Sequence, residues 1–295
     1  HMHDYLRAVG FANIKENKAL RGLLKLAEKH PSSEYVSSPD DAGIVYGEKL
    51  VESADRMGIN ICGEYDENGI FYRDYFFPFF RGRNTTFKGE VSIEKQSDRD
   101  AYSGVCDHIH MGVSVIFQLL NRADYVDNIP YKYGQTVFAP VILSGLSVYG
   151  RIILPLASGK EDKHRGKKDT KNRDMRIDAA RNGDKEAIES LTLEDMDTYA
   201  TVMKRTRKED VLTIVSSYFM PYGIACDQYS VLGEILEVQK VQNSITLENV
   251  YILTIDCNDL IFDVCINSQD LLGESMPGRR FRGNIWLQGI VDFMQ

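Results

Sequence analysis

A polar stretch rich in lysine and arginine interrupts the apolar pattern of this chain between Ser158 and Arg176. It carries eight Lys or Arg against four Asp or Glu, a local charge of +4 in a chain of net charge −8. Because it has almost no apolar side chains, it cannot bury enough surface to order itself as part of a hydrophobic core. The residues on both sides follow apolar strand patterns, so the sequence predicts two lobes with a charged connector between them.

Length and composition are those of a soluble protein with more than one domain. The chain has 295 residues, of which 43% are hydrophobic and 26% charged, and this length predicts about two domains. We expect an N-terminal lobe at 2–157, a charged helical connector at 158–208 and a C-terminal lobe at 209–295. The first two residues, His1 and Met2, are typical of a cloning remnant.

The cysteines and the hydropathy pattern indicate the cellular location of the protein. The five cysteines are odd in number and widely spaced, without a Cys-x-x-Cys motif, which favours reduced thiols in a cytoplasm. No apolar run approaches the ~18 residues that a membrane-spanning helix needs. The acidic balance argues against a dedicated nucleic-acid binder. We therefore expect a cytoplasmic protein without a membrane partner.

Local patterns in the N-terminal lobe predict one helix followed by strands. Apolar residues recur at helical spacing over 16–30, and Pro31 ends that pattern. The run at 111–120 fits a strand or a buried helix equally, because periodicity does not decide so short a stretch. Further apolar, β-branched runs that predict strands lie at 86–94, 136–146 and 148–156.

A β-hairpin with its turn at Asn68–Gly69 is the clearest local feature of this lobe. Asn-Gly strongly favours a two-residue turn in which both central residues take positive φ. The register that follows from this turn places Glu64 directly opposite Arg73, a favourable cross-strand pair. We expect the second strand to end at Pro78, because proline cannot donate a hydrogen bond to a neighbouring strand.

The C-terminal lobe has a second predicted hairpin over 250–267, with a two-residue turn at 258–259. Its alternation gives one apolar face and one mixed face, as in a half-buried antiparallel pair. The strand pattern at 229–240 changes phase between Ile235 and Leu236, which predicts a bulge or a strongly coiled strand. The expected fold class is α+β, with two β-rich lobes of antiparallel strands. The second lobe is expected to be small and barrel-like or OB-like.

Four segments of the chain carry a resemblance to a known family. They are the opening MHDYLRAVGF (2–11), ARNGDKEAIESLTLEDMDTY (180–199), YFMPYGIACD (218–227) and CINSQDLLGESMPGRRFRGNIWLQG (265–289). Together they resemble an uncharacterised clostridial family that is catalogued only as a domain of unknown function, number 3881. The resemblance covers the whole chain. It implies no activity, and it transfers no catalytic residue.

One segment has the residue types of a metal site. If the chain is extended there, Cys106, His108 and His110 point to one face, and a thiolate with two imidazoles suits Zn²⁺. The spacing matches no known site signature, and a fourth ligand cannot be named. The alternative is that the histidines lie on a polar strand face while Cys106 packs as a small apolar residue.

Arginines beside aromatic residues are the second candidate site. With the stretch at 158–176 they could supply phosphate contacts and stacking surfaces, as OB-like barrels do for single strands. The alternative is that they belong to turns and pair with the surplus of carboxylates. Trp286 is expected to anchor the core of the last strand, or else to be an exposed binding aromatic. The arginines are Arg81, Arg83, Arg279, Arg280 and Arg282.

The sequence has no motif with a known catalytic mechanism, neither a Gly-x-Ser-x-Gly elbow nor a phosphate-binding loop nor a His-Glu-x-x-His pair. We therefore expect a binding or assembly protein without catalytic residues or a required cofactor, with a protein partner or a second copy of itself. Its contact surface would combine Tyr75–Phe80 with the arginine-rich turns at 81–83 and 279–282. The alternatives are a single-stranded RNA-binding protein and a metal-dependent enzyme centred on Cys106.

Overall fold

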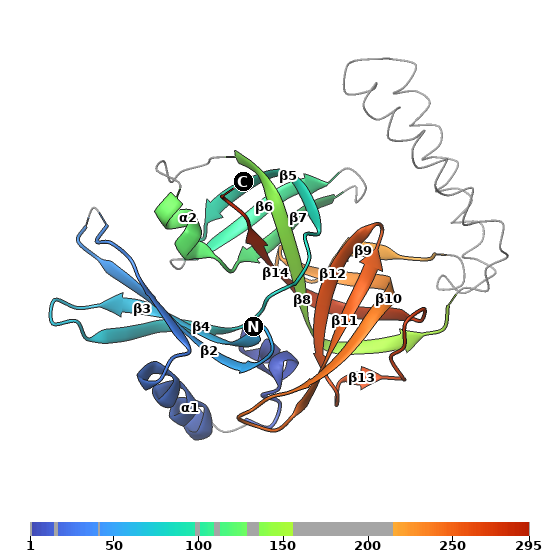
Figure 1. Cartoon of the computed structure of the whole chain (residues 1–295), viewed down its shortest axis with the longest axis horizontal. Helices are drawn as coiled ribbons and strands as arrows, with labels where there is room; N and C mark the ends of the chain where they lie inside the picture. The colour runs from blue at the N-terminus through green and yellow to red at the C-terminus, as the bar shows by residue number, and fades with distance from the viewer. Residues whose placement is uncertain are drawn as a thin grey trace, which may run out of the picture. The chain divides into compact units, whose positions relative to one another are not determined.

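The computed structural model describes residues 2–14, 17–40, 42–97, 101–108, 113–128, 136–155 and 215–294. His1–Ile153 and Ser217–Gln295 together form one unit, and Leu154–Ser216 form a second. The expected connector at 158–208 lies outside the described residues. All elements named below belong to the first unit (Figure 1).

A four-stranded antiparallel sheet, in the order β1-β2-β3-β4, forms the N-terminal part of this unit. The 3-10 helix η1 (Met2–Val9) and the helix α1 (Asn17–Lys29) precede it in the chain. Helix α1 agrees with the helical pattern predicted at 16–30. The strands of this sheet are β1 (Ser33–Val36), β2 (Val45–Ala54), β3 (Met57–Tyr65) and β4 (Phe71–Phe80).

The hairpin between β3 and β4 is present, but its turn is longer than the two residues predicted. Tyr65 pairs with Phe71, which leaves Asp66 to Ile70 in the loop. The Asp66 carboxylate accepts hydrogen bonds from the backbone N–H groups of Asn68 and Ile70, at 2.9 and 2.8 Å. An aspartate that binds its own backbone two residues on makes a local turn of its own. The Asp66 side chain therefore determines the length of the loop, and the preference of Asn-Gly for a two-residue turn does not.

Two further predictions for this hairpin are wrong, the pairing of Glu64 with Arg73 and the end of the strand at Pro78. Glu64 lies opposite Tyr72, and Arg73 forms its ion pair with Glu28 of α1. The strand also continues through Pro78 to Phe80. Strand β4 lies at the edge of the four-stranded sheet, where a proline leaves no inter-strand hydrogen bond unmade.

The remaining strands form a ten-stranded sheet. Strand β10 pairs with both β11 and β14, so the pairings β10-β11-β12-β8-β14 close into a circuit. A second circuit, β8-β5-β6-β7-β14, shares the β8–β14 pair. The strands are β5 (Phe87–Lys95), β6 (Tyr102–His108), β7 (Val113–Leu119), β8 (Thr136–Ile153), β9 (Tyr218–Pro221), β10 (Gln228–Gln242), β11 (Asn249–Cys257), β12 (Leu260–Asn267), β13 (Leu271–Leu272) and β14 (Arg280–Val291).

Strand β8 joins the two parts of the chain that the sequence assigns to separate lobes. It is one strand of 18 residues, where two strands are predicted at 136–146 and 148–156. Figure 1 shows it running from the β5–β7 strands to the β10–β12 strands. Strands from both expected lobes thus share one sheet, within a β-rich α+β fold. Within the ambiguous run at 111–120, residues 113–119 form strand β7. The short helix α2 (Arg122–Asn128) follows it.

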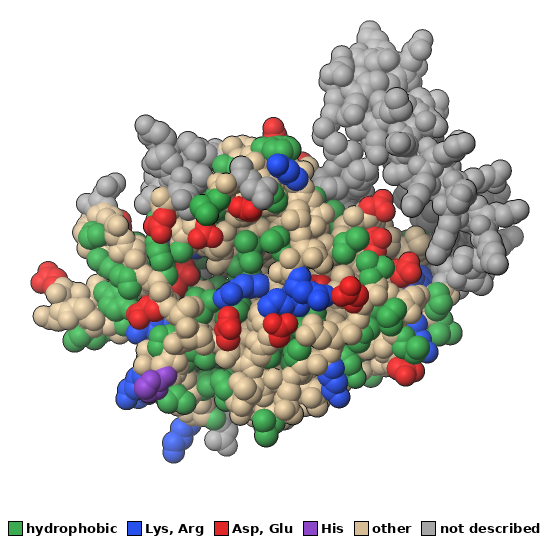
Figure 2. Space-filling view, viewed as in Figure 1, with side chains coloured by type: hydrophobic (Ala, Val, Ile, Leu, Met, Phe, Trp, Pro, Cys, Tyr) green, Lys and Arg blue, Asp and Glu red, His purple; other side chains and the backbone are tan. Residues whose placement is uncertain are grey.

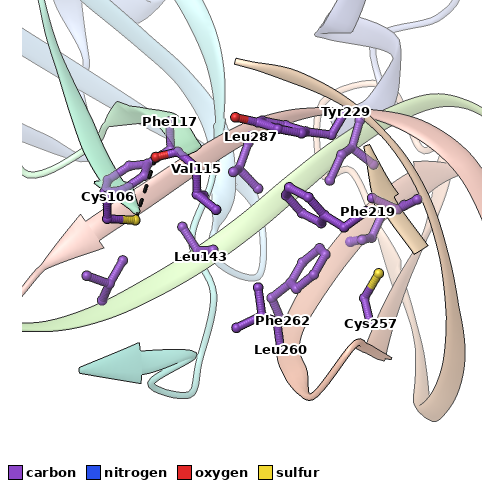
Figure 3. Packing of buried hydrophobic residues seen from close by; sticks show 14 of the residues in the cluster. Cys106, Val115, Phe117, Leu143, Phe219, Tyr229, Cys257, Leu260, Phe262 and Leu287 are labelled. Carbon is purple, nitrogen blue, oxygen red and sulfur yellow. Dashed lines mark hydrogen bonds between the residues drawn. The ribbon is translucent and has the colours of Figure 1, made fainter. Parts of the chain in front are cut away.

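The buried hydrophobic residues form two clusters, and each draws on both expected lobes. One contains Val91 and Val141 together with Val264 and Ile285, and Figure 3 shows part of it. The other contains residues of η1, α1, β3 and β4 together with Cys265 and Trp286. The expectation of a separate interior for each lobe is therefore wrong. Buried sheet faces of this kind need a covering layer on each side, which η1, α1 and the four-stranded sheet supply.

The C-terminal hairpin has the predicted register. Cys257 pairs with Leu260, and Asn258 and Asp259 take positive φ values of 53° and 67°, as a two-residue type I′ turn requires. The register of β10 against β11 shifts between Ile235 and Glu237, which confirms the bulge. Most of the mixed face of the hairpin is buried, and its residues Ile252 and Cys265 pack against the N-terminal elements; Ile261, near the turn, is exposed.

Candidate functional site

A pair of glycines brings β8 and β14 close together. Gly150 and Gly283 are directly opposite each other, and the ring of Phe281 lies over both on the core side. A Cβ atom added at Gly150 would lie 2.3 Å from that ring, and one added at Gly283 would lie 2.6 Å from it. Only glycine leaves this space, so these two positions set how the ring packs between the strands.

This packing places Arg151 and Arg282 directly opposite each other on the outer face of the sheet. Both side chains are exposed. Nε of Arg282 donates a hydrogen bond to the hydroxyl of Tyr218 at 3.1 Å. Neither arginine forms an ion pair with a residue in the described part of the chain. Like charges directly opposite each other in a sheet are destabilising, so this pair is a local conflict that the fold tolerates.

Apolar and aromatic side chains surround the arginine pair. Tyr149 is 49% exposed and lies opposite Asn284, two residues along the strands from the arginine pair. Leu272 of β13 pairs with Arg151, and Met220 lies on β9 opposite Ser230. We call this surface the arginine–tyrosine face; its residues are Tyr149, Arg151, Tyr218, Met220, Leu272 and Arg282.

The arginines predicted at 279–282 have three different environments. Arg279 forms an ion pair with Glu274, with 3.4 Å between Nη1 and Oε2, and also donates to the Glu274 carbonyl at 2.8 Å. Arg280 is buried opposite Glu234, and burial lowers the pKa of its guanidinium. Only Arg282 of the three belongs to the arginine–tyrosine face.

Trp286 is a core residue. It is buried, and its ring lies 5.4 Å from that of Tyr5 and 6.2 Å from that of Phe77, measured between centroids. Its Nε1 donates a hydrogen bond to Asp227 at 2.8 Å. Of the two interpretations drawn from the sequence, the structure supports the core anchor.

Arg81 and Arg83 belong to a second group of arginines, in which carboxylates of the same chain neutralise the positive charges. The carboxylate of Asp263, only 3% exposed, lies 2.9 Å from Nη1 of Arg56 and 3.5 Å from Nε of Arg83. Arg83 also pairs with Glu237 at 2.8 Å. The guanidinium of Arg81 stacks over Phe79, 4.9 Å from the ring centroid. On the face seen in Figure 2, Lys and Arg side chains gather beside Asp and Glu side chains in the middle of the view.

Arg56 and Arg83 are thus neutralised by carboxylates of the protein itself. The hydroxyl of Thr254 donates a further hydrogen bond to Asp263 at 2.6 Å, so the buried carboxylate has both cationic and neutral partners. Buried charges of opposite sign that satisfy one another are structural.

The aromatic segment Tyr75–Phe80 is not the contact surface expected from the sequence either, because Phe76, Phe77, Phe79 and Phe80 are buried.

The three residues of the zinc prediction are only partly described. Cys106 is buried in the core, and its Sγ donates to the carbonyl of Val115 at 3.6 Å, as Figure 3 shows. Burial raises the pKa of this thiol to about 12, which disfavours the thiolate that zinc binds. The side chain of His108 and all of His110 lie outside the described residues. Within the described part of the chain, no three His, Cys, Asp or Glu side chains form a metal-ligand group. The zinc site stays a prediction.

The sequence interpretation missed Tyr149, Arg151 and Tyr218. A pattern that could have indicated two of them is present, because Tyr149-Gly150-Arg151 and Phe281-Arg282-Gly283 both place a glycine beside an arginine in a strand. The pattern does not indicate that β8 and β14, which lie far apart in the chain, pair with each other.

Comparisons with known proteins add a family but no activity. A family model described as "Domain of unknown function, E. rectale Gene description" matches residues 6–289. No curated protein and no solved structure matches the chain. Within the described residues, no helix has the length and apolar character needed to cross a membrane.

Proposed function

The chain belongs to the family of domain of unknown function 3881, and from its geometry we propose a binding protein that recognises an anionic partner through the arginine–tyrosine face. One observation carries this proposal. Arg151 and Arg282 lie opposite each other without an ion pair in the described structure, in a chain with 43 Asp and Glu against 35 Lys and Arg.

The contrast with the other arginines supports a role for this pair. Arg83 and Arg279 each have a carboxylate partner within 3.5 Å, as a surplus of acidic residues makes easy. Local conflicts that persist in a folded chain are expected at functional sites. An anion bound between Arg151 and Arg282 would neutralise both guanidinium groups and remove their repulsion. Binding would therefore relieve the local conflict.

The strands behind the face support a binding surface as well. The circuit β10-β11-β12-β8-β14 favours the small barrel-like lobe predicted from the sequence, and closure of a sheet leaves few free edges. Binding is proposed over cysteine catalysis because burial raises the pKa of both Cys106 and Cys257 to about 12. A cytoplasmic location is part of the same proposal.

A charge-removal experiment tests this function. The full chain and the variant Arg151→Ala/Arg282→Ala are titrated against labelled heparin, polyglutamate and single-stranded RNA at low salt, where ionic contacts are strongest. We expect at least one of the three to bind, and the double variant to bind it about tenfold more weakly or worse. Arg279→Ala is the matched control, because it removes a half-buried arginine that already has a carboxylate partner. Absence of binding to all three polyanions, or equal binding by the double variant, contradicts the proposal.

A further inference from the structure

We propose that the anionic partner is a single-stranded nucleic acid, an inference that rests on the proposed function. Its basis is that the arginine–tyrosine face offers two kinds of contact side by side, cationic and aromatic. Non-specific binders of single strands combine positive side chains for the phosphates with aromatic rings on which bases stack.

The contacts lie along a line across the strands. Tyr218 pairs with Leu232, Leu232 with Arg282, Arg282 with Arg151, and Arg151 with Leu272. Five neighbouring strands contribute to this row, so it is about 19 Å long, four spacings of about 4.8 Å. An extended strand of nucleic acid that follows the row meets an aromatic ring, two cations and then an apolar side chain.

The tyrosines distinguish a nucleic acid from an acidic peptide. Carboxylates would neutralise the arginines as well as phosphates do, but they would leave the ring of Tyr149 in water, where it is 49% exposed. Unpaired bases can cover that ring by stacking, whereas a duplex keeps its bases inside. Nε of Arg282 donates to the hydroxyl of Tyr218; no other described residue binds this guanidinium, so its two Nη groups can donate to a phosphate.

The charge of the rest of the chain sets the expected strength. The net charge of −8 repels a polyanion at long range, so binding is expected to be weak and sensitive to salt. Two arginine–phosphate contacts on a single strand give a slope of about −1.4 for log K against log salt. A binder that used a larger basic surface would show a steeper slope.

The test is fluorescence anisotropy with the full chain and labelled single strands of about 12 nucleotides, within the usual site size of one small barrel. Single-stranded RNA and DNA, a duplex of equal length and polyglutamate are compared between about 50 and 200 mM salt. We expect the single strands to bind more tightly than the duplex and polyglutamate, with the slope given above. Arg151→Ala/Arg282→Ala is expected to abolish binding.

The tyrosine contribution has its own readout. Tyr149→Ala is expected to weaken binding about tenfold, while the salt slope stays unchanged because stacking releases no counterions. Tyr149→Phe keeps the ring and is expected to bind as the unmodified chain does. Tyr72→Ala removes another exposed tyrosine, on β4, and serves as the control without effect.

The outcomes separate the two proposals. If polyglutamate binds as tightly as the single strands and Tyr149→Ala has no effect, the nucleic-acid inference is overturned and the anion-binding function remains. If the single strands bind the double arginine variant unchanged, they contact another part of the chain, and the inference is overturned too. If no polyanion binds, both proposals fail.

Discussion

Arg151 and Arg282 face each other across β8 and β14, and neither is neutralised by another described residue. Cross-strand pairs of opposite charge contribute about 0.2–1 kcal/mol, and like charges in the same position destabilise. The pair therefore lowers the stability of a strand pairing on which both circuits of the sheet depend. Arg73 and Arg83, two other exposed arginines of the described strands and loops, each have a carboxylate partner, whereas Arg151 and Arg282 have only each other across the strands.

Arg151→Glu is expected to stabilise the protein. The substitution converts a repulsive cross-strand pair into an attractive one, a gain of about 0.5–1 kcal/mol in the free energy of unfolding. Urea denaturation followed by circular dichroism measures it. The same variant should lose anion binding, so stability and function would move in opposite directions. Arg279→Glu, which places a negative charge beside Glu274, is the control and should not stabilise. A loss of stability in Arg151→Glu would show that the arginines do not repel each other in the folded protein.

Gly150→Val is expected to destabilise the protein by about 2–3 kcal/mol, because the added side chain overpacks the core. Its Cβ would lie 2.3 Å from the ring of Phe281, at a position where β8 and β14 are paired on both sides. Thermal or urea unfolding measures the loss. Gly22 of α1 gives the matched control, since no atom lies within 4 Å of a Cβ added there. Gly22→Ala should stabilise by about 0.5–1 kcal/mol, as alanine does in a helix interior. Unchanged stability in Gly150→Val would mean that the ring moves aside freely.

The sequence predicts those parts of the fold that neighbouring residues decide. The turn at Asn258–Asp259 and the bulge after Ile235 follow from short patterns, and both are present. The turn after Tyr65 follows from such a pattern too, but the Asp66 side chain competes with Asn-Gly for it. In each case the deciding contacts lie within a few residues of one another, where sequence patterns carry information.

Pairings between distant segments could not be predicted in the same way. Loop closure permits many partners for an apolar strand, and β8 reads as two strands because Ser147 and its neighbours interrupt the apolar run. Once β8 pairs with β12 and β14, the two expected lobes share a sheet. The arginine–tyrosine face exists only through that pairing. The sequence pattern around Arg151 resembles that around Arg282, but only the strand pairing shows that the two arginines face each other.

Asp263→Ala is expected to destabilise the protein by about 3 kcal/mol, because removal of one partner leaves buried cationic groups uncompensated. Arg56 has its Nη1 2.9 Å from this carboxylate, and its side chain is only 17% exposed. Glu237→Ala is the control: it removes an exposed partner of Arg83 and should cost about 0.5 kcal/mol or less. Equal effects in urea unfolding would contradict the difference between a buried and an exposed ion pair.

Thiol labelling is expected to modify one cysteine per folded chain. Cys226 is exposed, whereas Cys62, Cys106, Cys257 and Cys265 are buried. Burial also raises the pKa of three of these buried thiols, Cys106, Cys257 and Cys265, which lowers the fraction of reactive thiolate. Labelling with a chromogenic disulfide near neutral pH, with and without denaturant, counts the fast thiols. Cys226→Ser should leave none. Rapid labelling of Cys106 in the folded state would show that the strand carrying it opens, and would revive the thiolate that a zinc site needs.

Stability is expected to fall with rising pH above about pH 9. Burial raises the pKa of Cys106 and Cys257 from 9.0 to about 12 in the folded protein. Between these values the unfolded chain loses thiol protons that the folded chain keeps. The folded state then binds more protons, so the free energy of unfolding decreases by up to about 1.4 kcal/mol per pH unit for each thiol.

The stabilisation from these two thiols is therefore complete below about pH 9 and is lost as the pH rises towards 12. Urea unfolding at pH values from about 8 to 10.5 measures the slope, and Cys257→Ala should make it shallower whatever the variant costs near neutrality. Tyr229, whose pKa burial raises from 10.0 to about 12, adds to the same loss at the upper end of the range. A free energy of unfolding that stays constant across this range would mean that water reaches both thiols in the folded protein.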